Sequence, residues 1–322
     1  MGAPGPSHLG TWESADSAPA KNGPSLVPNL APGLYLVATP IGNLEDITLR
    51  ALNVLRSVDR IACEDTRQTQ KLLNHFQISA PTISCHEHNE DARARELVES
   101  LKAGARIAVV SDAGMPGISD PGSRLVEAAI EAGIAVIPIP GANAALSALV
   151  ASGLPANEFA FLGFLPEKSG ARRTRIEELA AGIAGSEGTA RRTLIFYEAP
   201  HRILDTLADL EAVWSPDLQV VVARELTKLH EEFLRGTVAR IRRELAGRDR
   251  VRGEITLLVE PPLKSSQAGS AGATEKLTDR LARLQSEAGI DEKEALKRLA
   301  RESGQSKSEL YRELQRQRAR KK

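Results

Sequence analysis

A stretch rich in glycine and proline, residues 111–122, has the composition of a loop that binds a small ligand. It reads SDAGMPGISDPG and joins an apolar run to an amphipathic segment, so we expect it to connect a strand to a helix. Glycine permits backbone torsions and close approaches that a Cβ atom would forbid, and proline stiffens the chain. Such connections usually take about two to six residues, and longer ones tend to be functional. We interpret this one as a ligand cradle, the alternative being an ordinary connection.

The end of this loop predicts how the next helix begins. Pro121 suits a first helical position, with Asp120 or Ser119 as the capping residue. The first backbone amides of the helix would then face the concave side of the loop. A second loop of small residues, PGANAA at 140–145, follows another predicted strand and begins another helix in the same way. Both loops are therefore candidates for one binding site.

Side chains able to transfer protons follow several other predicted strands. The candidates for a general base, which we leave unranked, are Glu64, Asp65, His88, His201, Glu225 and Lys228. Glu64 and Asp65 are close to Arg67 in the sequence. These residues could carry out acid-base chemistry, cap a helix or form a local ion pair, and we favour the cap. Ion-pair networks collect at strand ends too, so a structural role is the alternative for each candidate.

A metal site is disfavoured. His86 and His88 alternate, which on a strand places them on one face, but a site needs three or four ligands and no further His or Cys cluster lies nearby. Cys63 and Cys85 are the only cysteines. They exclude an all-cysteine zinc site, argue against a disulfide framework and indicate a reducing cytoplasm.

Short apolar runs alternate with amphipathic segments along most of the chain. The expected strands lie at 34–38, 60–63, 81–84, 106–110, 134–139, 159–165, 193–197, 219–223, 233–236 and 253–259. Strand and helix alternate five times up to about residue 155, which predicts a mostly parallel α/β sheet, and the later order predicts a second α/β domain with mixed pairing. Polar clusters at the strand ends of both domains predict one cleft between them.

The remaining segments differ in composition from these two domains. We expect a disordered leader at 1–32, α/β domains at 33–155 and 156–262, a linker at 263–274 and a basic tail with helix-turn-helix spacing at 275–322. Lys plus Arg and Asp plus Glu balance at 42 each, but residues 264–322 hold fifteen cations against nine carboxylates. That excess fits either a nucleic-acid footprint or a solvated helical face.

No apolar run approaches the roughly 20 residues of a membrane span, and the leader lacks the charged start and apolar centre of a signal peptide. We therefore expect a soluble, unsecreted protein without a membrane partner. The chain is long enough, at 322 residues, for two real cores.

Several motifs occur in the order typical of one family. TPIGNLEDIT, ACEDTR, HEHNE, SDAGMPGISDPG, PGANA, YEAPHR, ARELTKLHEE and GEITLLVE resemble the tetrapyrrole methylase superfamily, the class III S-adenosylmethionine-dependent methyltransferases, and within it the branch that modifies small-subunit ribosomal RNA. The resemblance covers residues 33–260, and the tail is similar to the branch's small helical domain. The leader to Ala31 has no counterpart.

The resemblance implies a cofactor, a substrate and a set of site residues. It implies a homodimer that binds S-adenosylmethionine between two α/β domains and methylates the ribose 2′-oxygen of a decoding-centre cytidine in 16S rRNA. The implied cofactor-binding residues are Ser111, Asp112, Ala113, Gly114, Pro116, Gly117, Ile118, Gly141, Ala142, Asn143, Ala144, Tyr197, Glu198, Ala199, Pro200, Glu254, Ile255 and Thr256. Arg67, Arg172, Arg173 and Arg202 are our candidates for RNA binding, and Arg202 could hold a phosphate group in a bidentate fashion.

Two other functions remain open from sequence. The protein could methylate a small macrocycle, or it could be a non-catalytic RNA-binding factor in ribosome assembly. TPIGN stands where porphyrin and corrinoid methylases carry a glycine-rich loop, a departure that favours RNA over a tetrapyrrole substrate.

Overall fold

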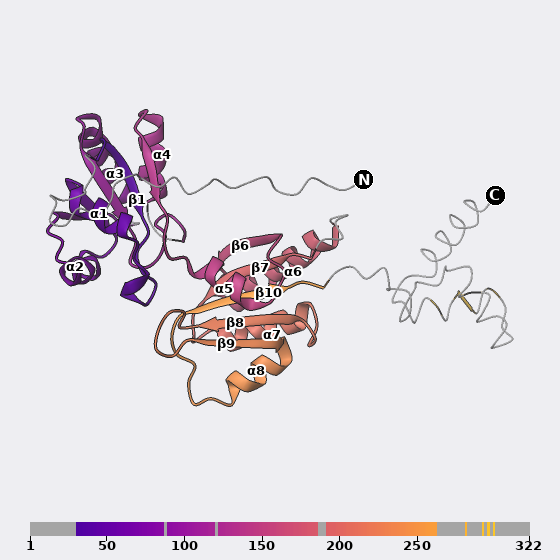
Figure 1. Ribbon diagram of the computed structural model, residues 1–322. Helices are drawn as coiled ribbons and strands as arrows, with labels where there is room; N and C mark the ends of the chain where they lie inside the picture. Colours follow the sequence, from indigo (N-terminus) through magenta and orange to yellow (C-terminus); the bar gives the residue numbers. More distant parts are fainter. Residues whose placement is uncertain are drawn as a thin grey trace, which may run out of the picture. The chain divides into compact units, whose positions relative to one another are not determined.

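The computed structural model describes residues 30–86, 89–119, 122–185 and 191–262 (Figure 1). It also describes five helical positions in the tail, Leu281, Glu292, Ala295, Leu296 and Leu299. Residues 1–29 of the expected leader, the linker and the rest of the basic tail lie outside the described residues. Both sheets belong to one compact unit, and residues 177–191 and 261–322 belong to another.

The first sheet is built from five strands and is parallel in every pairing. The strands are β1 (Gly33–Val37), β2 (Arg60–Cys63), β3 (Thr82–Ser84), β4 (Arg106–Val110) and β5 (Val136–Ile139), in the order β3-β2-β4-β1-β5. This agrees with the repeated strand and helix order of the sequence. The carboxyl ends of parallel strands meet at one edge, where open α/β sheets bind their ligands.

Helices cover both faces of this sheet. They are α1 (Leu49–Ser57), α2 (Thr66–His75), α3 (Glu90–Lys102) and α4 (Ser123–Glu131), and a 3₁₀ turn (Leu44–Asp46) precedes α1. Val37 packs in a cluster with α1 and α2, whereas Leu34 packs in another with α3 and α4. Because strand side chains alternate between faces, α1 and α2 cover one side and α3 and α4 the other.

The second sheet is mixed. Its strands are β6 (Phe159–Phe164), β7 (Thr193–Glu198), β8 (Gln219–Arg224), β9 (Glu232–Thr237) and β10 (Ile255–Glu260), in the order β6-β7-β10-β8-β9. Only β6 and β7 pair in parallel, and the other neighbours are antiparallel. The helices α6 (Ser169–Gly185), α7 (Ile203–Val213) and α8 (Val238–Ala246) follow β6, β7 and β9, and α7 packs against α8.

Helix α5 (Ala144–Ser152) connects the two halves of this unit (Figure 1). It follows the last strand of the first sheet, yet Ala148 and Leu149 pack with Ile195 and Leu258 of the second. Ile41, from the loop after β1, joins the same cluster. The helix that we expected within the first domain therefore contributes its apolar side to the second sheet.

The start of α4 differs from the expected one. The helix begins at Ser123. Its capping residue is Gly122, which has no side chain to accept a hydrogen bond from the first amides of the helix. Ser119 is thus not the cap, and Asp120 and Pro121 lie outside the described residues. Instead, the buried carboxylate of Glu90, the first residue of α3, accepts hydrogen bonds from the amides of Gly122 (2.8 Å) and Arg124 (3.1 Å). A carboxylate at a helix N-terminus is favourable because it faces the positive end of the helix dipole.

None of the helices in the described ranges is long and apolar enough to cross a membrane.

Candidate active site

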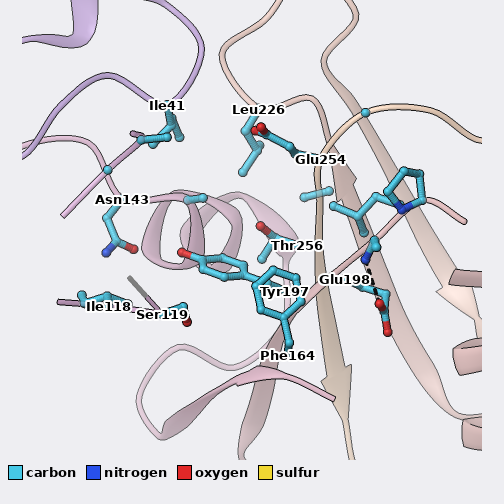
Figure 2. A pocket seen from close by; sticks show the side chains of 18 of the residues that line it. Ile41, Ile118, Ser119, Asn143, Phe164, Tyr197, Glu198, Leu226, Glu254 and Thr256 are labelled. Atoms are coloured by element: carbon cyan, nitrogen blue, oxygen red, sulfur yellow. Dashed lines mark hydrogen bonds between the residues drawn. The ribbon is translucent and has the colours of Figure 1, made fainter. Parts of the chain in front are cut away.

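A cavity of about 380 Å³ lies where the loops after β1, β4 and β5 meet β7, β8 and β10 (Figure 2). Its lining is mostly apolar with a few polar groups, as is usual for a small-molecule site. The lining residues are Ile41, Ala113, Gly114, Met115, Ile118, Ser119, Asn143, Ala144, Phe164, Tyr197, Glu198, Ala199, Pro200, Ala223, Leu226, Gly253, Glu254, Ile255 and Thr256. Both halves of the compact unit therefore build one pocket, as the sequence predicts.

The glycine-rich loop after β4 is tied to β1 at the wall of this pocket. Thr39 and Gly114 form an isolated two-bond bridge, with nitrogen to oxygen distances of 2.9 and 3.1 Å. The hydroxyl of Thr39 also donates to the carbonyl of Ser111 (3.1 Å). Gly114 has a left-handed φ of 83°, and a Cβ atom there would stand 3.4 Å from Ile41 Cγ2. A side chain at Gly114 would therefore strain the backbone beside the cavity.

The small residues after β5 bring the loop that precedes α5 close to the end of β1. A Cβ atom on Gly141 would stand 2.8 Å from the Cβ of Ala38, so only glycine fits without a shift. Asn143 caps α5, and its side-chain oxygen accepts from the amide of Leu146 (2.9 Å). Asn143 and Ala144 line the cavity. The expectation that a helix begins at this loop is thus correct.

Aromatic rings form one side of the cavity. Tyr197 makes edge contacts with Phe161 and Phe164, at centroid distances of 4.9 and 5.7 Å. Figure 2 shows the Tyr197 ring beside Phe164, with Thr256 close by. Phe164 is 56% exposed although it lines the cavity, so it offers an open aromatic face to a ligand.

Glu198, which we expected to bind the cofactor, is held by its own structural network. Its side chain is fully buried and accepts from both Nε (2.9 Å) and Nη2 (2.6 Å) of Arg202. It also accepts from the hydroxyl of Thr206 (2.6 Å) and the amide of Ala199 (2.7 Å). This network shapes the cavity wall and uses the guanidinium that we expected to contact phosphate.

Two of the expected base candidates form an ion cluster at the edge of the cavity. The Lys228 ammonium donates to Glu225 (2.9 Å) and to the cavity-lining Glu254 (3.0 Å). The bond from Lys228 lowers the pKa of Glu225. Burial acts to lower the pKa of Lys228, but its bonds to the two carboxylates raise it overall. The Glu225 carboxylate therefore holds a proton less readily than usual, and the Lys228 ammonium keeps the proton that it has. Neither group is suited to accept a proton from a substrate.

The loop that carries this cluster has a strained backbone. Glu225 and Thr227 have φ values of 54° and 65°, a region that glycine favours. Each such residue costs about 1–3 kcal/mol, and the conformation persists only where its surroundings fix it. The Glu231 carboxylate contributes by accepting from the amide of Thr227 (2.7 Å). Strain of this kind is frequent at functional sites.

A second group of carboxylates lies beyond the loop after β4. Asp65 caps α2 as we favoured, and the side chain and amide of Arg67 hold its pKa at about 2. The amide of Asp65 in turn donates to Asp112 (3.4 Å). Burial, with Asp112 and Asp65 nearby, raises the pKa of Glu64. Glu64 is thus the carboxylate candidate with increased proton affinity.

The structure brings together many, but not all, of the predicted site residues. The expected cofactor residues that do not line the cavity are Ser111, Asp112, Pro116, Gly117, Gly141 and Ala142. None of the described base candidates, Glu64, Asp65, His201, Glu225 and Lys228, lines it, and His88 lies outside the described residues. Among the described residues, no three His, Cys, Asp or Glu side chains are placed to hold a metal ion.

The expected phosphate-binding arginines divide into two kinds. Arg172 is 2% exposed and paired with Asp209 (2.8 Å), and Arg202 is paired with Glu198, so both positions argue against the RNA role that we expected. Arg67 and Arg173 are exposed, and Arg67 pairs with Asp65 (2.8 Å). Burial and a carboxylate partner leave a guanidinium unavailable to phosphate.

Some residues that line the cavity were not predicted from the sequence. They are Ile41, Met115, Ser119, Phe164, Ala223, Leu226 and Gly253. Ile41, Met115, Ser119, Ala223, Leu226 and Gly253 lie inside the motifs quoted above, so those motifs were a signal that could have found them. Phe164 lies in no such motif, and the pattern there shows only the end of an expected strand.

Sequence comparisons identify relatives over most of the chain. Residues 33–242 match the family described as tetrapyrrole (corrin/porphyrin) methylases. The chain is 47% identical over 283 residues to the ribosomal RNA small subunit methyltransferase I of Halalkalibacterium halodurans, covering 86% of this chain and 93% of the relative. It is 52% identical over 234 residues to the protein of the same name from Vibrio cholerae, covering 72% and 78%.

Solved structures share the fold at low sequence identity. A conserved hypothetical protein from Aeropyrum pernix K1 superposes with a TM-score of 0.56 at 20% identity, covering 73% of this chain and 86% of that one. A diphthine synthase superposes with a TM-score of 0.52 at 16% identity, covering 71% and 89%. At these identities the likeness establishes the architecture alone.

Proposed function

The chain belongs to the tetrapyrrole methylase family, and from this premise we propose that it methylates the ribose 2′-oxygen of a decoding-centre cytidine in 16S rRNA. Methyltransferases of this family use S-adenosylmethionine. One observation supports RNA as the substrate. About half of the aligned residues are identical to those of proteins named for methylation of small-subunit rRNA. Those alignments span most of both chains.

The cavity suits S-adenosylmethionine in size and chemistry. Its volume of about 380 Å³ falls within the usual range for small-molecule sites, and Gly114 keeps its wall free of a side chain. Phe164 and Tyr197 offer aromatic surface to a flat ring, and Thr256 and Glu254 offer polar groups. The residues that would hold the cofactor are Ala113, Gly114, Ile118, Asn143, Ala144, Tyr197, Ala199, Pro200, Ile255 and Thr256. When bound, it supplies an electrophilic methyl group.

The protein's own groups position the acceptor and remove its proton. A ribose hydroxyl is a weak nucleophile at neutral pH, so a base within hydrogen-bond reach should accept its proton. We propose Glu64 for that role: it does not line the cavity itself, so the acceptor ribose would have to lie between it and the bound methyl group, and its pKa is raised by burial whereas those of Asp65 and Glu225 are lowered. Glu64 lies at the end of β2, and its neighbour Asp65 contacts Asp112, which precedes the cavity-lining Ala113. The mostly apolar cavity would exclude water from the reacting atoms.

The same relatives support the biological setting of the proposal. The substrate would be the small ribosomal subunit or its RNA, and the place of action the cytoplasm. A homodimer is implied by the family resemblance and remains part of the proposal.

Labelled S-adenosylmethionine tests the proposed substrate directly. Purified full-length protein is incubated with small subunits that lack the modification and, separately, with a corrin precursor. The proposal expects label in the RNA and none in the corrin. Label in the corrin alone would establish the small-molecule alternative, and tight RNA binding without transfer to either would establish the non-catalytic one.

A further inference from the structure

Two loops of the second sheet lie next to each other at the edge of the cavity. Arg224 joins them, because its guanidinium donates to the carbonyl of Arg252 (3.1 Å) and to that of His230 (3.5 Å). The amide of Glu225 also donates to the carbonyl of Glu254 (2.9 Å). Leu226 of the first loop and Glu254 of the second line the cavity. What binds on these loops therefore lies beside the cavity.

Ion pairs hold the two loops in place. Glu232, at the start of β9, accepts from Arg224 (3.0 Å) and from both Nη1 (2.8 Å) and Nη2 (2.6 Å) of Arg248. Lys228 adds its bonds to Glu225 and Glu254 on the cavity side. The strained Thr227 shows that the first loop keeps one conformation against its local preference. The loops thus form a fixed platform.

Two arginines of the second loop take part in no ion pair among the residues that the structure describes. Arg250 and Arg252 are exposed, and half-buried Val251 lies between them. Neither arginine takes part in an ion pair within the described ranges, unlike Arg224 and Arg248. Asp249 is an exposed carboxylate beside them, and the platform, residues 224–232 and 247–254, holds five Lys and Arg against five Asp and Glu. Because Arg224, Lys228 and Arg248 are neutralised within ion pairs, Arg250 and Arg252 are the platform cations that are left to meet an anionic ligand.

An exposed apolar side chain stands at the tip of the first loop. Leu229 is 93% exposed, the highest value among the large hydrophobic residues that the structure describes, and exposed His230 follows it. At this exposure Leu229 contributes almost no buried apolar area to the fold. In nucleic-acid complexes, apolar side chains insert beside unstacked bases, and histidine can stack on a base.

We propose that Leu229, His230, Arg250 and Arg252, here called the rim surface, bind the RNA strand that carries the methyl acceptor. Arg250 and Arg252 contact phosphates, for which guanidinium groups have matching donor geometry. Leu229 packs against a base that neighbours the acceptor, so that the ribose reaches the cavity beside Glu254. That the bound strand is the methylated RNA rests on the proposed function.

The double variant Arg250→Ala/Arg252→Ala tests the phosphate contacts. Binding of a fluorescent decoding-region RNA, followed by anisotropy at several salt concentrations, should weaken about tenfold. The slope of log Kobs against log salt should become shallower by about 1.4, the value for two contacts to a single strand. Affinity for S-adenosylmethionine, measured by calorimetry, should stay unchanged because neither side chain lines the cavity.

A matched control separates a local contact from loss of charge. Arg240→Ala/Arg243→Ala removes two exposed arginines of α8, which also take part in no ion pair among the described residues, and RNA affinity should stay within about twofold. Leu229→Ala should weaken RNA binding about fivefold with an unchanged salt slope, since it removes no charge. Equal losses in the two double variants would overturn the proposal.

The remaining outcomes distinguish this inference from the proposed function. If the wild type methylates small subunits while Arg250→Ala/Arg252→Ala binds RNA as tightly as the wild type, the rim surface is wrong and the function stands. If the wild type transfers no methyl group but the double variant still loses RNA affinity, the function is wrong and the rim surface stands. Loss of affinity for assembled subunits but not for naked RNA would indicate a ribosomal protein contact and overturn the proposal.

Discussion

The Cγ atom of Lys228 lies 2.5 Å from the point that a Cβ atom on Gly42 would occupy. The same point is 2.9 Å from the backbone carbonyl of Leu226. Gly42 follows cavity-lining Ile41 in the loop after β1, and Leu226 lines the cavity from the loop after β8. Glycine at position 42 therefore lets two loops from distant parts of the sequence meet beside the cavity.

Gly42→Ala should weaken cofactor binding. Because a backbone carbonyl stands in the way, the loop that carries Leu226 must shift, and we expect about a tenfold loss of affinity for S-adenosylmethionine by calorimetry and about 1–3 kcal/mol of stability. Gly170→Ala is the control, since a Cβ there meets nothing within 4 Å. An affinity equal to the wild type in Gly42→Ala would show that this contact does not shape the cavity.

Arg202→Ala should destabilise the fold rather than weaken RNA binding. The substitution leaves the carboxylate of Glu198 buried without its cation, which typically costs about 3–5 kcal/mol in unfolding free energy. His201→Ala, at the exposed neighbouring position, should change stability by less than about 0.5 kcal/mol. Denaturant unfolding measures both variants. A stable Arg202→Ala protein with a shallower salt dependence of RNA binding would restore the phosphate role.

Glu64→Gln should reduce methyl transfer about 10²- to 10⁴-fold while cofactor binding persists. Because the pKa of Glu64 is raised above 4.5, the wild-type single-turnover rate should fall with acidification while the pH is still above 4.5, as this carboxylate becomes protonated. The variant should lack that acidic fall. Asp65→Asn keeps Glu64 and should keep the fall. An identical pH profile in Glu64→Gln would assign the base elsewhere.

Protonation of Glu232 should lower the free energy of unfolding at acidic pH. Arg248, followed by Arg224, lowers its pKa from 4.5 to about 2, so it binds fewer protons in the folded state than in the unfolded one. Its contribution, at most about 3 kcal/mol, is present above pH 4.5 and is lost as pH falls toward 2. The difference in unfolding free energy between wild type and Glu232→Gln should therefore shrink over that window. Glu99→Gln, an exposed carboxylate on α3, controls for loss of charge, and a constant difference would refute the linkage.

Local patterns predicted the elements well. The strand expected at Arg106–Val110 has those bounds in the structure, and Asp65 is the helix cap that its position before an amphipathic segment favoured. These features depend on residues within a few positions of each other. Apolar periodicity and capping chemistry report such short-range structure directly.

Contacts between distant elements were not predictable in the same way. Glu90 caps α4 from α3, α5 packs on the second sheet, and Arg172 pairs with Asp209 on another helix. A charged side chain in a sequence does not reveal its partner, so Arg172 and an exposed arginine look alike. The motif around residues 111–119 indicated a cavity wall, but which of its residues face inward depends on backbone torsions such as the left-handed φ of Gly114.

Nucleoside analysis of the modified RNA tests the central claim most directly. Small subunits that lack the modification are incubated with the wild-type protein and labelled S-adenosylmethionine, and the RNA is digested to nucleosides for mass spectrometry. The account predicts label in a cytidine with the added methyl group on the ribose, and no label with Glu64→Gln over the same time. Label on a base, or no label in the RNA at all, would contradict it.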